Sequence, residues 1–192
     1  MKESKVYSSA ARAARISAGM CALAMLLSIN AGPANAGEII PSLGITKSTD
    51  DNAGDAKFSG GLAFRGAIVP FLKAEVGVSY REQSYFGDDL TIQQWPITGS
   101  LWLTPFPVFY AGGGVGYYQT TYKYSGLLPF DSSTDQKFGV HLGGGLDVPI
   151  APRLGLDISG RYIFMEQKQS ELPPNEFNPD FWTTSVGLAI KF

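Results

Sequence analysis

The chain has 192 residues, 15 basic and 17 acidic side chains, and a formal net charge of −2. This balance excludes a strongly basic protein of the kind that binds nucleic acid through its phosphates. A mean hydropathy of +0.01 with 12% aromatic residues also excludes a bundle of membrane-spanning helices.

The first 36 residues have the layout of a cleaved signal peptide. Four basic residues precede an apolar stretch, Ile16–Ile29, that is too short to span a bilayer as a helix. Ala34-Asn35-Ala36 then matches the small-x-small cleavage rule. A retained N-terminal anchor is the alternative, but it would need a longer apolar run. A lipoprotein site at Cys21 is disfavoured because Met20 precedes it where a small residue is expected.

Removal of residues 1–36 leaves residues 37–192, a length typical of a single domain. This part carries 11 basic and 16 acidic residues, so its formal net charge is about −5. Cys21 is the sole cysteine and lies in the leader. The remaining chain therefore offers neither disulfides nor thiolate metal sites.

Apolar residues alternate with small or polar ones through most of residues 37–192, which is typical of strands with one apolar face. We expect eight strands, at 39–48, 58–68, 72–81, 90–103, 107–124, 138–148, 153–164 and 182–192. Pro41 suggests a strand start, and Pro96 suggests a bulge or bend. The sequence does not assign the residues of the glycine-rich run Ala111–Gly116 to the inner or the outer face.

The connections between these strands alternate in kind. The segments near 49–56, 83–89, 125–135 and 167–180 are long, polar and acidic, whereas those near 69–70, 104–107 and 150–152 are short and contain proline. Long loops at one end and tight turns at the other are typical of a barrel in the bacterial outer membrane. An even strand number would place both ends of the barrel domain on the periplasmic, short-turn side.

Charged residues of both signs lie on one face of the predicted strands. They are Arg65, Lys73, Glu75, Arg81, Asp147, Asp157, Arg161 and Lys191. A soluble ligand-binding barrel would place apolar side chains inside, whereas lipid-facing charges would cost several kcal/mol each near the bilayer midplane. We therefore expect these charges to line and plug the interior, with Arg161–Asp157 and Lys73–Glu75 paired along their own strands. A proton or ion path through them is the alternative.

Aromatic residues near the predicted strand ends favour two girdles at the membrane interfaces. Phe58, Tyr80, Trp102, Phe181 and Trp182 are among them. A carbohydrate-binding platform is the alternative.

The loops hold most of the acidic residues, which could bind divalent cations or simply be solvated. The third long loop also holds an apolar stretch that could dock a partner, formed by Leu127, Leu128 and Phe130.

His141 is the only histidine, so any histidine-based catalysis would depend on it. The position two residues along is Gly143, which supplies no nucleophile, although a serine could approach from another strand. We interpret His141 as an interior polar residue. The sequence predicts no catalytic residues, no metal site and no cofactor.

Several segments resemble the outer-membrane protein β-barrel domain family, the small OmpA- and OmpX-like barrels. They are the glycine-rich run Pro107–Tyr118, the stretch Phe138–Ile150, the stretch Pro152–Tyr162 and the terminal Phe192. The resemblance implies an all-β, eight-stranded antiparallel up-and-down transmembrane β-barrel that the barrel-assembly machinery inserts. It also implies that Phe192 is part of the signal that this machinery reads.

The sequence therefore predicts an integral outer-membrane protein in contact with membrane lipid and lipopolysaccharide. We expect a structural or adhesin-like scaffold that is not an enzyme, whose long loops carry any activity towards an unknown partner. A narrow pore for water or small solutes is the first alternative, and a lipid A-modifying enzyme is the second.

Overall fold

The computed structural model describes residues 37–50, 53–85, 90–124, 133–166 and 179–192. Contacts divide the chain into residues 1–35 and 36–192, and the described residues belong to the second unit. The predicted signal peptide lies outside the described residues, so it remains a prediction. Among the described residues, no helix has the length and apolar character needed to cross a membrane.

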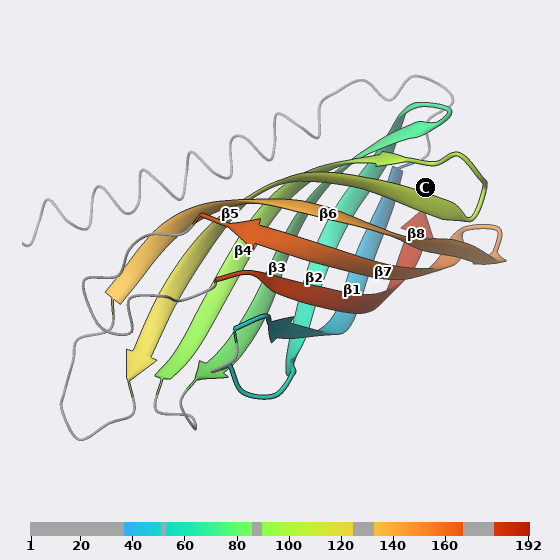
Figure 1. Ribbon diagram of the computed structural model, residues 1–192. Helices are drawn as coiled ribbons and strands as arrows, with labels where there is room; N and C mark the ends of the chain where they lie inside the picture. Colours follow the sequence, from blue (N-terminus) through green and yellow to red (C-terminus); the bar gives the residue numbers. More distant parts are fainter. Residues whose placement is uncertain (1–36, 51–52, 86–89, 125–132, 167–178) are drawn as a thin grey trace, which may run out of the picture. The chain divides into compact units, whose positions relative to one another are not determined.

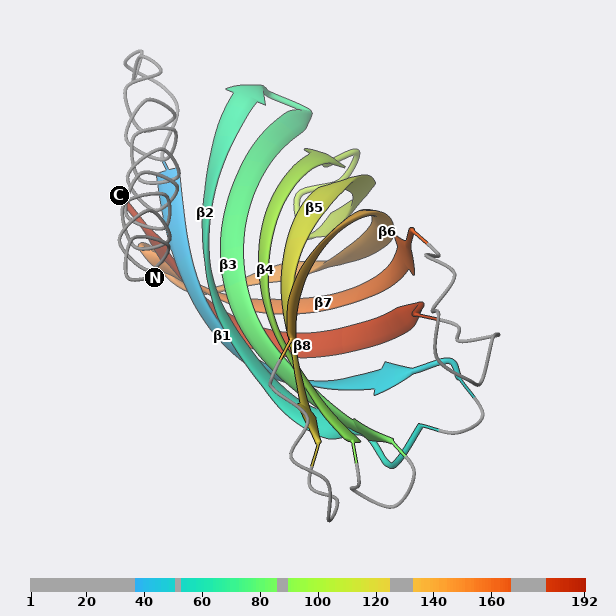
Figure 2. The same cartoon turned by 90° about the vertical axis from the view of Figure 1, so that its left-hand side faces the viewer.

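The described residues form eight β-strands. These are β1 (Gly37–Ser48), β2 (Lys57–Val69), β3 (Leu72–Tyr85), β4 (Leu90–Leu103), β5 (Phe109–Tyr124), β6 (Ser133–Ala151), β7 (Leu154–Met165) and β8 (Phe181–Lys191). Each strand pairs antiparallel with the next, and β8 returns to pair with β1, so the sheet closes into a barrel (Figure 1, Figure 2). The predicted eight-stranded up-and-down fold is confirmed.

The barrel has two different ends. At the turn end lie Gly37, Phe192 and the short connections β2–β3, β4–β5 and β6–β7. At the loop end lie the longer connections, most of which fall outside the described residues. The Phe192 amide donates to the Gly37 carbonyl at 3.0 Å, which extends the closing β1–β8 ladder to the turn end.

The outer wall is apolar, as the period of two predicts. Leu43, Val115 and Leu142 are exposed there, as are apolar residues of the other strands. Aromatic pairs stand at both ends of this wall. Tyr80 and Trp95 (ring centroids 5.0 Å apart) lie nearer the loop end, and Phe64 and Phe192 (6.1 Å) nearer the turn end. Such a wall buries apolar surface only if lipid covers it.

Two aromatic residues that the sequence assigned to the girdles lie inside instead. Trp102 is 0% exposed and Phe181 is 3% exposed, both on the inner face. Trp102 packs edge-on against Tyr110, with ring centroids 5.3 Å apart. The girdle assignment of Trp102 and Phe181 was therefore wrong, because proximity to a strand end does not determine which face a ring occupies.

The two prolines interrupt pairing without ending their strands. β1 begins at Gly37, so the expectation that Pro41 marks a strand start was wrong, although the β1–β8 ladder skips Ile40 and Pro41. At Pro96 the β3–β4 ladder skips two positions and resumes in the same register, so no bulge forms there. A proline in a ladder lacks the N–H that its neighbour would accept.

The glycine-rich run of β5 makes room inside the barrel. Tyr110 and Tyr118 point inward at its two ends and are buried. A Cβ on Gly116 would lie 2.6 Å from the Tyr118 ring, and a Cβ on Gly145 of β6 would lie 2.5 Å from the Tyr110 hydroxyl. Glycine is required at these two positions because large rings occupy the space of a side chain.

Candidate functional site in the barrel interior

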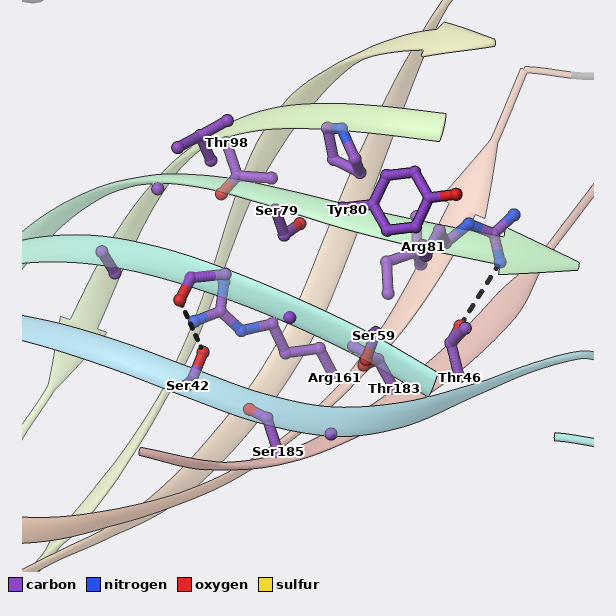
Figure 3. A pocket seen from close by; sticks show the side chains of 18 of the residues that line it. Ser42, Thr46, Ser59, Ser79, Tyr80, Arg81, Thr98, Arg161, Thr183 and Ser185 are labelled. Carbon is purple, nitrogen blue, oxygen red and sulfur yellow. Dashed lines mark hydrogen bonds between the residues drawn. The ribbon is translucent and has the colours of Figure 1, made fainter. Parts of the chain in front are cut away.

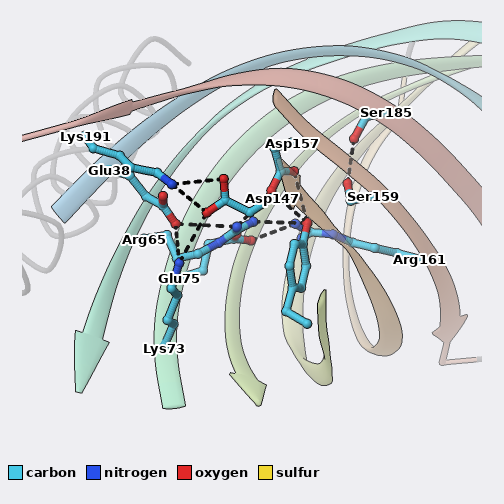
Figure 4. A network of polar contacts seen from close by, with 11 residues as sticks. Glu38, Arg65, Lys73, Glu75, Asp147, Asp157, Ser159, Arg161, Ser185 and Lys191 are labelled. Carbon is cyan, nitrogen blue, oxygen red and sulfur yellow. Dashed lines mark hydrogen bonds and ion pairs between the residues drawn. The ribbon is translucent and has the colours of Figure 1, made fainter. Parts of the chain in front are cut away.

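Charged side chains from six strands meet inside the turn-end half of the barrel (Figure 4). This ion network consists of Glu38, Arg65, Lys73, Glu75, Asp147, Asp157, Arg161 and Lys191. Among the described residues it joins four carboxylates to four cations, so its formal charge is balanced. Balance matters because an unpaired charge buried in a narrow lumen is costly.

Arg65 on β2 lies at the centre of the ion network and is 1% exposed. Its Nη2 lies 2.7 Å from Glu75 on β3, and its Nη1 lies 2.8 Å from Asp157 on β7. The Arg65 Nε also donates to Glu75 at 2.8 Å, so the guanidinium binds this carboxylate through two nitrogens. Paired N–H donors on one carboxylate are the strongest form of such contacts.

Glu75 also receives Arg161 from β7, whose Nη2 lies 2.7 Å from Oε1. One Glu75 oxygen thus contacts Arg161 and the other contacts Arg65, which ties β2, β3 and β7 together across the lumen. Tyr110 on β5 contacts two members of the ion network, Asp157 and Arg65. Its hydroxyl donates to Asp157 at 3.0 Å, and the Arg65 guanidinium lies 4.4 Å from the centre of its ring.

The ion network continues towards the turn end through two lysines. Lys73 Nζ lies 3.1 Å from Glu38 and 3.6 Å from Asp147, and Lys191 Nζ lies 3.0 Å from Asp147. The two lysine side chains are 26% and 29% exposed. The ion network is therefore buried at Arg65 and is partly exposed at its two lysines, which lie towards the turn end.

The structure brings together seven of the eight charged residues named from the sequence. Arg81 lies elsewhere, nearer the loop end, where it donates to Gln94 at 2.5 Å and to Thr46 at 3.3 Å. Its guanidinium stacks 3.4 Å from the centre of the Phe181 ring.

The expected pairs along single strands were wrong. Arg161 contacts Glu75 rather than Asp157, and Lys73 contacts Glu38 and Asp147 rather than Glu75. Successive inward side chains of a strand point the same way, whereas carboxylates on facing strands point towards the cation.

Sequence reasoning missed Glu38, which is part of the ion network, and Tyr110, which contacts it. Glu38 was missed because the first strand was expected to begin after it, although Glu38, Ile40 and Ser42 already alternate with exposed positions. Tyr110 was missed because the faces of the glycine-rich run could not be assigned.

A different set of side chains fills the loop-end half. Tyr118, Ile163, Met165 and Phe181 form a buried apolar group, which we call the loop-end cluster. Beside it Gln83, 0% exposed, accepts from the Ser48 amide at 3.4 Å and donates to the carbonyls of Gly54 (3.3 Å) and Asp55 (3.4 Å). Amide groups, apolar packing and the Arg81 guanidinium stacked on Phe181 therefore fill this end.

His141 and Ser100 form a buried pair between the two halves. The Ser100 Oγ lies 2.9 Å from the His141 Nε2, and both residues are at most 5% exposed. His141 Nδ1 has no hydrogen-bond partner among the described residues, so no carboxylate there orients the ring. A serine does approach from another strand, but the acid that would complete a catalytic triad is not among its contacts.

Other predicted features stay untested. Leu127, Leu128 and Phe130 lie outside the described residues. Phe192 is exposed on the outer wall, where its role as an assembly signal remains a prediction. In the ranges that the structure describes, no three histidine, cysteine or acidic side chains gather as metal ligands would.

Comparison with known proteins identifies the family. Residues 19–192 match the model of the outer membrane protein β-barrel domain. The chain belongs to this family. No curated protein is significantly similar to it in sequence.

Solved structures of small outer-membrane barrels are similar to this chain in fold. Neisserial surface protein A has a TM-score of 0.64 at 16% identity, covering 81% of this chain and 97% of its own. The attachment invasion locus protein Ail of Yersinia pestis has a TM-score of 0.55 at 14% identity, covering 82% and 99%. The outer membrane protein OprG of Pseudomonas aeruginosa has a TM-score of 0.53 at 16% identity, covering 82% and 96%.

Proposed function

We propose that this outer-membrane protein is a non-conducting, non-enzymatic scaffold that acts through the loops at the loop end of its barrel. The observation that carries the proposal is the dry centre of the ion network. Arg65, Glu75 and Asp157 are each at most 4% exposed and link β2, β3 and β7 across the lumen.

A narrow pore is disfavoured by the same contacts. A conducting lumen needs a continuous wet path, and ions must leave their sites as easily as they enter. Here the Arg65 guanidinium is paired with three carboxylates, those of Glu38, Glu75 and Asp157, and packs on the Tyr110 ring. Opening a path would separate these ion pairs in a low-dielectric interior, which costs several kcal/mol.

Catalysis at Ser100 and His141 is disfavoured by access. Both side chains are buried in the middle of the barrel, with the Trp102 ring centroid 6.2 Å from that of His141. A lipid substrate would have to reach them through the wall or past the loop-end cluster. The outer wall faces lipid, so the rims are the surfaces left for partners in water.

The experiment that tests this proposal is conductance in planar lipid bilayers. Purified folded protein is inserted in 1 M KCl, and we expect no steady conductance steps. A variant with both Arg65→Ser and Tyr110→Ala, which opens the centre of the ion network, should conduct and so shows that the assay detects a pore. Steady steps from the unmodified protein, of a size similar to those of the variant, would overturn the proposal.

A loop replacement tests the second half of the proposal. The segments 125–132 and 167–178 would be replaced by short glycine- and asparagine-containing turns. Adhesion of expressing cells to host-cell monolayers should fall to that of cells without the protein, while the Arg65→Ser variant should retain it. Equal adhesion before and after loop replacement would argue against a surface-interaction role.

A further inference from the structure

A chamber in the barrel interior is lined by residues of both the ion network and the loop-end cluster (Figure 3). Seven serine and threonine side chains on β1, β2, β3, β4 and β8 line it: Ser42, Thr46, Ser59, Ser79, Thr98, Thr183 and Ser185. Three of them, Ser42, Thr46 and Thr183, donate to main-chain carbonyls. Its volume is about 100 Å³. One water needs roughly 10–15 Å³ by this measure, so the chamber has room for a polyatomic ion with water around it.

The chamber exists because one side of the lumen carries small side chains. Gly61, Ala63 and Gly77 face inward on β2 and β3, whereas Tyr118 and His141 fill the opposite side from β5 and β6. This uneven filling leaves a space beside the serine and threonine side chains.

Arg161 supplies the chamber with a cation that has unused donors. Its side chain lines the space and keeps 19% of its surface exposed. Among the described residues, Nη2 binds Glu75 at 2.7 Å, and no hydrogen bond is made by Nη1 or Nε. A guanidinium has five N–H donors and accepts nothing, so the remaining donors favour an acceptor with negative charge.

Among the described residues, the carboxylate that lines the chamber is that of Glu75. Both Glu75 oxygens are already bound by arginines, Oε1 by Arg161 and Oε2 by Arg65. A carboxylate neutralised in this way repels an incoming anion little, whereas hydroxyl groups such as Ser79 and Thr98 can donate to it.

We propose that the chamber is a binding site for a small tetrahedral oxyanion, of the phosphate or sulfate type, held by Arg161 with the hydroxyl groups of Ser59, Ser79 and Thr98. Arginine with several hydroxyl donors matches the geometry and charge of such an ion. The site lies on the loop side of the ion network, so it does not require a conducting lumen.

Trp102 gives a direct way to observe binding. The Arg161 Cζ lies 5.0 Å from the centre of the Trp102 ring. An anion bound to the guanidinium therefore changes the electrostatic environment of the indole and its fluorescence. In a Trp95→Phe, Trp182→Phe background Trp102 is the only tryptophan. Folded protein in phosphate-free detergent would be titrated with inorganic phosphate, then separately with sulfate, against chloride at equal ionic strength.

We expect a saturable change in Trp102 fluorescence with phosphate or sulfate but not with chloride. Arg161→Gln should abolish it, and Thr98→Val should weaken the apparent affinity roughly tenfold, because a hydrogen bond to a charged ligand is lost. The matched control is Thr184→Val on the outer wall, which should leave the affinity unchanged. A heat-modifiability gel on each variant establishes that it is folded.

Three outcomes would overturn the proposal. The first is no saturable change with either oxyanion in folded protein. The second is an equal response to chloride, which would reveal an ionic-strength effect on the ion network. The third is an affinity that Thr98→Val and Thr184→Val alter alike.

Discussion

The two halves of the lumen are filled by opposite means. In the turn-end half, ion pairs of 2.7–2.8 Å join Arg65 to Glu75 on the neighbouring strand and to Asp157 across the lumen. In the loop-end half, the loop-end cluster is apolar, the Arg81 guanidinium stacks on the Phe181 ring, and Gln83 binds main-chain groups. The comparison teaches that the lumen of a barrel of this size can be filled by a network of paired charges in one half and by apolar and amide side chains around an arginine in the other.

The largest expected effect is on the ion network. Arg65→Met removes a buried cation that contacts three carboxylates, and Asp157 then loses its ion pair. We expect the free energy of unfolding in lipid vesicles to fall by about 4 kcal/mol, the typical cost of breaking a buried pair. Urea titration monitored by heat-modifiable gel mobility measures it. The control is Lys47→Met at an exposed position of β1, for which a loss as large as that of Arg65→Met would contradict the account.

Two tyrosines of the same strand sharpen the comparison between the halves. Tyr110 donates to Asp157, whereas the Tyr118 hydroxyl has no hydrogen-bond partner among the described residues. Tyr110→Phe should lower the free energy of unfolding by about 2 kcal/mol, since a hydrogen bond to a charged group is lost. Tyr118→Phe should leave the free energy of unfolding unchanged. The same urea titration distinguishes the two variants. Equal losses would show that the halves do not differ as described.

The smallest expected effect concerns a glycine of the loop-end half. A Cβ on Gly116 would lie 2.6 Å from the Tyr118 ring, whereas a Cβ on Gly99 would meet nothing within 4 Å. Gly116→Ala should lower the free energy of unfolding by about 1 kcal/mol, as overpacking does. Gly99→Ala, as the matched control in β4, should cause no loss. A larger loss at Gly99 than at Gly116 would be inconsistent with this packing.

The alternation of residues predicted the strands and the inward charges because a charge on a lipid-facing position is so costly that its face is nearly determined. Apolar residues carry no such information. Phe181 and Trp102 are as compatible with lipid as with the interior, so the sequence placed them on the wrong face. Which cation meets which carboxylate was also out of reach, since Arg65 and Asp157 are 92 residues apart and meet only once the barrel closes.

The account's central claim is that the charges across the lumen act as a unit. A double-mutant cycle on Arg65→Met and Asp157→Asn, which lie on β2 and β7 and meet across the lumen, tests it most directly, with free energies of unfolding measured in lipid vesicles. We expect the double variant to lose less stability than the two single variants added together, by at least about 1 kcal/mol, as residues in one buried ion pair do. Strict additivity would contradict the claim, because it would mean that the two side chains stabilise the barrel independently.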